Sequence, residues 1–198
     1  MLDSVSGPVL AVLESVSMVA FAVLAYRFYL VARDVGGSRV YYYCFGFLLL
    51  SLAQAVMLLS VIYVNPRASL SLYAASSVLS FSGFYAFMLG RRPTQETLKG
   101  YEGASMPVAV VWLKSVIAVM DYAAGFMGIV VSLSFKGVAR YLVFLIAVSY
   151  VIRGSMLASS IVSGSSVLLA IMLAGELARS MAAAVLSIAY ILPESERS

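Results

Sequence analysis

The stretch GRRPTQETLKGYEGASMP, residues 90–107, is the longest mostly polar run in this sequence. Strongly apolar segments lie on both sides of it, about three before and about three after, each near the ~20 residues that a helix needs to cross a bilayer. In a bilayer a helix satisfies its own backbone hydrogen bonds. We therefore predict an all-α, polytopic integral membrane protein, built as a bundle of about six transmembrane helices.

The composition supports this class of protein. Hydrophobic residues make up 63% of the 198 residues and charged residues only 11%, whereas a soluble protein carries roughly 25% charged residues. The spans and their short connections use up the chain, so we expect a single transmembrane domain over residues 1–198 and no nucleic-acid-binding domain. The lipid bilayer is the expected partner, and a homo-oligomer or a larger membrane complex is a further possibility.

Proline, glycine and asparagine predict where the spans begin and end. The N-terminus lacks the basic region of a cleavable signal, so we expect the first helix to be retained. The first half of the domain covers about 8–89 and the second about 108–192, with the polar linker 90–107 between them. The predicted helices cover residues 8–32, 40–64, 68–89, 108–133, 138–162 and, after a turn at 163–165, the segment that ends at Leu192.

The basic residues near span ends predict the orientation. If the spans alternate in direction, the loops 33–39 and 90–107 share one side, with Arg33, Arg39, Arg91, Arg92 and Lys99. The other side then carries both termini, with Arg67, Lys136 and Arg197, and Arg140 one turn inside. Because basic loops tend to stay in the cytoplasm, we expect a multi-pass protein of the cell membrane with a cytoplasmic 90–107 loop and both termini outside.

The two halves resemble each other weakly. At an offset near 99 or 100, Pro8-Val9 matches Pro107-Val108 and Met57-Leu58 matches Met156-Leu157. Because each half has an odd number of spans, a duplication in an alternating chain would be an inverted repeat, as in many transporters. Chance matches between segments rich in Leu, Val, Ala and Ser are the alternative, and both interpretations stay open here.

Ionisable residues inside the spans need an explanation, because each costs about 2.5 to 3.5 kcal/mol on insertion into a bilayer. Glu176 and Arg179, three residues apart on one helix, are close enough to pair. Lys114 lies two turns before Asp121 on nearly the same face. Gln54 is also deep in its span, at the place that matches Arg153 in the other half. The ionisable set is balanced in charge: Glu14, Lys114, Asp121, Arg153, Glu176 and Arg179.

Two interpretations of these residues stay open. One is a substrate or ion path through the bundle, formed by Gln54 and the ionisable set. The other is a network of salt bridges that fixes the packing of the helices. A water-accessible cavity around the charges would favour the path, and pairing in a dry core would favour the network. Arg91 and Arg92 are predicted either to contact lipid or an acidic partner, or to anchor the topology.

Enzymatic chemistry is not expected. The chain has no histidine, which excludes bis-His haem and histidine-based zinc or hydrolase sites. It also lacks phosphate-loop and dinucleotide fingerprints, and the single Cys44 cannot form an internal disulfide. We therefore predict no catalytic residues, no cofactor and no metal site.

Two functions remain as hypotheses. The first is a small transporter or channel-like protein with a charged path through the membrane. The second is a non-catalytic subunit, sensor or assembly factor of a larger membrane complex. Such a protein would bind its partner through the small residues of the third and sixth spans and through the basic loop.

Overall fold

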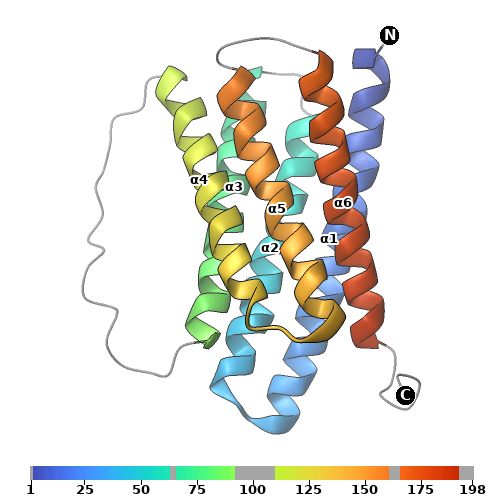
Figure 1. Ribbon diagram of the computed structural model, residues 1–198, viewed down its shortest axis with the longest axis vertical. Helices are drawn as coiled ribbons and strands as arrows, with labels where there is room; N and C mark the ends of the chain where they lie inside the picture. The colour runs from blue at the N-terminus through green and yellow to red at the C-terminus, as the bar shows by residue number, and fades with distance from the viewer. Residues whose placement is uncertain (1, 63–65, 92–109, 161–165, 192–198) are drawn as a thin grey trace.

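The part of the chain that the structure describes folds into six long helices (Figure 1). The computed structural model describes residues 2–62, 66–91, 110–160 and 166–191, without the side chains of residues 2–6, 38, 66–67, 110–114, 159–160 and 166–169. Each helix is long and apolar enough to cross a membrane, which confirms the all-helical fold, while membrane insertion stays a prediction. The helices are α1 (Leu2–Val35), α2 (Ser38–Ile62), α3 (Pro66–Arg91), α4 (Val110–Ser132), α5 (Gly137–Ser160) and α6 (Ser166–Ile191).

Most helix ends lie close to their predicted positions. α1 ends where Gly36 adopts a positive φ of 70° and its N–H donates to the carbonyl of Ala32 at 2.9 Å, a common helix C-cap that favours glycine. The main difference is at the start of α1, which begins at Leu2 rather than at Pro8. Pro8 therefore lies inside the helix, where it removes one backbone hydrogen bond.

The helices form a closed ring. Each packs against its two neighbours along the chain, and α1 completes the ring by packing against α6. The backbones of α2 and α5 do not approach each other closely within the described residues. The centre of the ring must therefore be filled by side chains, and the largest fully buried ones are Arg153, Arg179, Tyr150 and several phenylalanines.

α3 and α4 run in the same direction (Figure 1). Tyr73 lies near Asp121, and further along both helices Arg91 Nη1 donates to the carbonyl of Val130 at 3.0 Å. The three helices of the first half therefore run in the same directions as those of the second. This arrangement differs from the predicted inverted repeat, which requires α3 and α4 to be antiparallel. The polar linker lies almost wholly outside the described residues.

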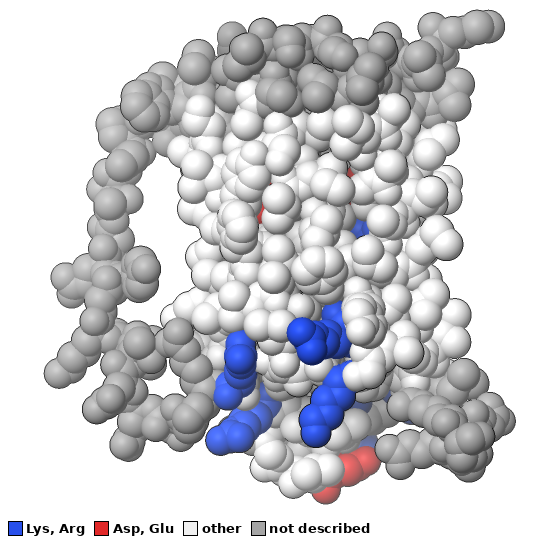
Figure 2. Space-filling view, viewed as in Figure 1, with Lys and Arg blue, Asp and Glu red and all other residues white. Residues whose placement is uncertain are grey.

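Lys136 and Arg140 are at the same end of the bundle as the α1–α2 turn, because α3 and α4 are parallel. Figure 2 shows Lys and Arg side chains gathered at that end. The alternating topology predicted these two residues on the other side. We call this end the basic end; it carries Arg27, Arg33, Arg39, Arg91, Lys136 and Arg140. α1 begins at the opposite end and α6 finishes at the basic end (Figure 1), while sidedness in a membrane stays a prediction.

Aromatic rings fill the bundle next to the basic end. The ring centres of Phe47 and Phe87 are 4.7 Å apart, and Phe28 lies 5.3 Å from Phe47. Phe84 continues the stack to Tyr150, with a centre-to-centre distance of 5.5 Å. We call this stack the aromatic layer; it consists of Phe21, Phe28, Tyr43, Phe47, Phe84 and Phe87.

Small residues lie at several contacts between helices inside the bundle. A Cβ atom on Gly83 of α3 would lie 3.0 Å from the carbonyl oxygen of Gly46 on α2, so the two backbones approach closely there. In α6, Ala182 and Ala183 are buried. The small-residue positions predicted as a partner-binding face thus contribute, at these points, to packing between the chain's own helices.

Candidate functional site: a buried polar cluster

Six of the predicted site residues are buried at the centre of the ring. Their exposure is 0 to 2%, although they come from five different helices. We call them, together with Tyr150, the central polar cluster: Glu14, Gln54, Asp121, Tyr150, Arg153, Glu176 and Arg179. Lys114, the seventh predicted residue, lies in α4, but its side chain is outside the described part of the structure.

Asp121 and Arg153 form a closed ion pair between α4 and α5. Arg153 donates from Nε to Asp121 Oδ2 at 2.9 Å and from Nη2 to Asp121 Oδ1 at 2.6 Å. This is a bidentate contact, in which two nitrogens of the planar guanidinium bind the two oxygens of one carboxylate. Ser77 Oγ lies 3.4 Å from Arg153 Nη2, and the Tyr73 hydroxyl lies 3.5 Å from Asp121 Oδ2. The pair is neutral and ties the two helices together.

Glu14, Glu176 and Arg179 form a second group, which we call the acid–arginine triad. Arg179 Nη2 donates to Glu14 Oε1 at 2.7 Å, and the same nitrogen pairs with Glu176 Oε2. This confirms the predicted pairing of Glu176 with Arg179. The triad links α1 to α6, and a buried contact of 2.9 Å between the hydroxyls of Ser17 and Ser180 supports the same junction.

Tyr150 of α5 lies between these two groups. Its ring centre is 4.8 Å from Arg153 Cζ and 5.5 Å from Arg179 Cζ. Its hydroxyl accepts a hydrogen bond from Gln54 Nε2 at 2.9 Å and lies 3.2 Å from Ser80 Oγ. The electron-rich ring faces stabilise nearby cations, so one tyrosine connects the two charged groups.

Several buried polar atoms of the cluster have no hydrogen-bond partner within the described part of the bundle. Among the described residues, Glu14 Oε2, Gln54 Oε1 and Arg153 Nη1 have no hydrogen-bond partner, nor do Nε and Nη1 of Arg179. An unpaired buried polar atom costs about 1–3 kcal/mol. A network built only to fix helix packing gains nothing from such atoms, whereas a site that exchanges a ligand or water needs them.

Sequence reasoning missed the two tyrosines of the site, Tyr73 and Tyr150. Tyrosine in a membrane span is usually expected near the headgroups, and Tyr150 is instead fully buried at the bundle centre. The signal available in the sequence was its position three residues before Arg153, which places both on one helix face. The sequence could not predict which helix Tyr73 contacts, because it does not show the order of the helices in the ring.

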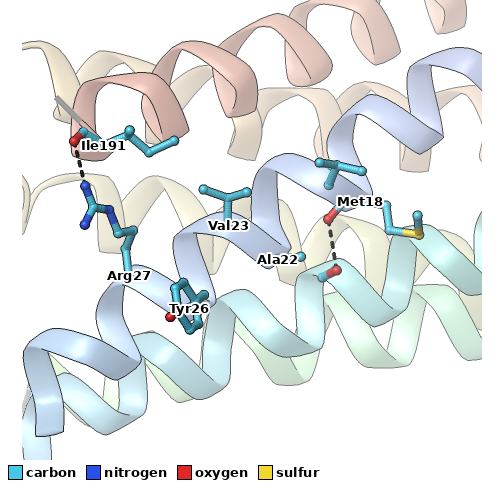
Figure 3. A pocket seen from close by; sticks show the side chains of 8 residues that line it. Met18, Ala22, Val23, Tyr26, Arg27 and Ile191 are labelled. Carbon is cyan, nitrogen blue, oxygen red and sulfur yellow. Dashed lines mark hydrogen bonds between the residues drawn. The ribbon is translucent and has the colours of Figure 1, made fainter.

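The two surface grooves found on α1 lie outside this cluster. The larger, of about 610 Å³, is lined mainly by apolar side chains of α1 (Figure 3). At its end Arg27 Nη2 donates to the carbonyl of Ile191 at 2.6 Å, and Ser51 Oγ donates to the carbonyl of Met18 at 2.9 Å. The second groove is lined by Ser15, Ser187 and apolar residues. Neither of these grooves is lined by a residue of the central polar cluster, whose side chains are buried.

Of the two predicted contact residues, only Arg91 is described, and it lies at the basic end. Arg91 is exposed, and Arg92 lies outside the described residues. In the part of the chain that the structure describes, no group of three or more Cys, Asp or Glu residues is placed to hold a metal ion. Comparisons of the chain with protein-family models, with curated proteins and with solved structures give no match.

Proposed function

We propose that this chain is a small, non-catalytic membrane transporter or channel-like protein whose ion or substrate path runs through the central polar cluster. The observation that carries the proposal is the acid–arginine triad. Its two carboxylates share one guanidinium nitrogen, and Glu14 Oε2 is left unpaired at 0% exposure. Buried charge that is not fully paired is costly in a membrane and marks ion or substrate pathways.

The two charged groups have different roles in this proposal. Asp121 and Arg153 form two hydrogen bonds with each other. Their pair therefore holds α4 and α5 together. The acid–arginine triad is not neutral when all three groups are ionised, so it is the part that binds the ion or substrate. Lys114, Gln54 and Tyr150 complete the proposed path.

The aromatic layer suggests from which end the path opens. It fills the ring between the cluster and the basic end, as seen along α2, where Tyr43 and Phe47 lie between Arg39 and Gln54. We therefore propose that water enters from the opposite end, where α1, α3 and α4 begin. By the positive-inside rule the basic end faces the cytoplasm, which makes the outer side the expected entrance.

Thiol labelling tests the path. In a Cys44→Ala background, we would introduce Ser180→Cys beside the triad and, separately, Ser77→Cys beside Arg153. Both serines are buried, and cysteine nearly conserves their size without removing a charge. Lys136→Cys at the exposed basic end serves as the marker for that side.

The proposal expects a membrane-impermeant thiol reagent to label position 180 from the side opposite position 136. If both buried cysteines stay unlabelled from either side in a folded protein, while position 136 is labelled, the path does not exist. Labelling of position 77 alone would move the proposed site to the Asp121–Arg153 pair.

A second candidate is a non-catalytic subunit, sensor or assembly factor of a membrane complex, or a homo-oligomer. It is favoured by one observation: each buried charged residue that the structure describes forms at least one ion pair with another, within the core. Large apolar side chains such as Phe126, Tyr141 and Val119 face outwards and would contact lipid or a partner. Purification in mild detergent followed by mass measurement would reveal a stable partner or a second copy.

A further inference from the structure

We propose that Glu14 and Glu176 bind one proton between them, so that the acid–arginine triad is a buried proton-binding site. This inference rests on the proposed function, because it names the ion that the path would carry. It applies to a specific pair of side chains from opposite ends of the sequence, one on α1 and one on α6.

The first argument is the geometry around Arg179. Glu14 Oε1 lies 2.7 Å from Arg179 Nη2, and Glu176 Oε2 pairs with the same nitrogen atom. Two carboxyl groups that both contact one nitrogen atom are necessarily close to each other. Two ionised carboxylates at this separation repel, whereas one protonated carboxyl donates a hydrogen bond to the other.

The second argument is the balance of charge. Two carboxylates and one guanidinium leave one uncompensated negative charge in side chains that are 0 to 3% exposed. A bound proton cancels that charge and also provides a hydrogen-bond donor for an acceptor such as Glu14 Oε2, which is otherwise unpaired. A protonated carboxyl therefore removes the uncompensated negative charge of the triad and supplies the missing hydrogen-bond donor.

The charged and titratable groups that the structure describes around the triad do not compensate its remaining negative charge. On α5, the Tyr150 ring faces both Arg179 and Arg153, and Arg153 is already neutralised by Asp121 of α4 at 2.6 Å. Tyr73 of α3 lies over Arg153, and α2 contributes the uncharged Gln54. The side chain of Lys114 is outside the described residues, and its backbone lies two helical turns from Asp121.

Infrared spectroscopy of the purified protein tests the proton directly at pH 7. Exposed carboxyl groups are ionised at this pH, so a carbonyl stretch from a protonated carboxyl, shifted by D₂O, would come from a buried one. We expect this band in the wild type. We also expect it to be lost in Glu14→Gln and, separately, in Glu176→Gln, because the remaining carboxylate then pairs with Arg179 alone.

Asp34→Asn is the matched control, since Asp34 is exposed and paired with Arg33; this variant should keep the band. Absence of the band in the folded wild type would overturn the proposal, and stabilisation by added sodium would then assign the site to a metal cation. A band that persists in both glutamine variants would also overturn it, by placing the proton elsewhere. A band that behaves as expected without thiol labelling at position 180 would leave the proton site standing and remove the transport function.

Discussion

The guanidinium carbon of Arg153 lies 4.8 Å from the centre of the Tyr150 ring, and the same ring also faces Arg179. The aromatic faces partly replace the hydrogen bonds that the unpaired guanidinium nitrogens lack. Tyr150 is therefore the residue through which the neutral Asp121–Arg153 pair and the acid–arginine triad act on each other.

We predict that the two parts of Tyr150 contribute differently to stability. Tyr150→Phe removes only the hydroxyl that accepts from Gln54 and should lower the free energy of unfolding by about 1 kcal/mol. Tyr150→Leu also removes the ring faces and should cost more, because desolvated cation–π contacts are worth about 2 kcal/mol. Thermal unfolding in detergent measures both. Tyr141→Phe, at a tyrosine that is 69% exposed, should behave as wild type, and equal effects of the two Tyr150 variants would contradict this role.

The Asp121–Arg153 pair gives a second prediction about stability. Arg153→Met leaves Asp121 as an unpaired buried charge and should cost about 3–5 kcal/mol. Adding Asp121→Leu should recover most of that loss, because two apolar side chains need no partner in a bilayer. Chemical or thermal unfolding of the single and double variants provides the comparison. If the double variant is no more stable than the single one, the pair has a role beyond holding α4 and α5 together.

Close packing of α2 against α3 gives the third prediction. A Cβ atom on Gly46 would overlap the ring of Phe87, so Gly46→Val should destabilise the bundle by about 1–3 kcal/mol or more. Gly7→Ala is the control, since a Cβ atom there meets nothing within 4 Å. The midpoint of thermal unfolding should fall for the first variant and stay unchanged for the second. A tolerated Gly46→Val would mean that the two helices are further apart.

The parallel arrangement of α3 and α4 gives the fourth prediction. Val35 and Val138 are 73% and 68% exposed and lie at the same end of the bundle, whereas alternating spans would put them on opposite sides. Single cysteines at these two positions, without Cys44, should react with an impermeant reagent from the same side. Ile62→Cys, at the end of α2 away from them, should react from the other side. Labelling of positions 35 and 138 from opposite sides would restore the alternating topology and the inverted repeat.

Some members of the site could be predicted because their chemistry is visible within one span. Glu176 and Arg179 are three residues apart, and that spacing alone predicted their ion pair. Glu14 and Asp121 were recognisable as charges too costly to leave without a partner in a bilayer. Their partners could not be predicted, since Glu14 and Arg179 are separated by nearly the whole chain.

The six helices, their approximate ends and the presence of ionisable residues within them follow from the amino-acid sequence alone, because hydrophobicity and backbone hydrogen bonding act within each segment. The packing of the helices set their order in the ring, the parallel direction of α3 and α4 and the gathering of basic residues at one end. It also decided that Arg179 contacts two carboxylates while Arg153 contacts one. These features depend on how large central side chains and close glycine contacts fit between helices, which no single segment specifies.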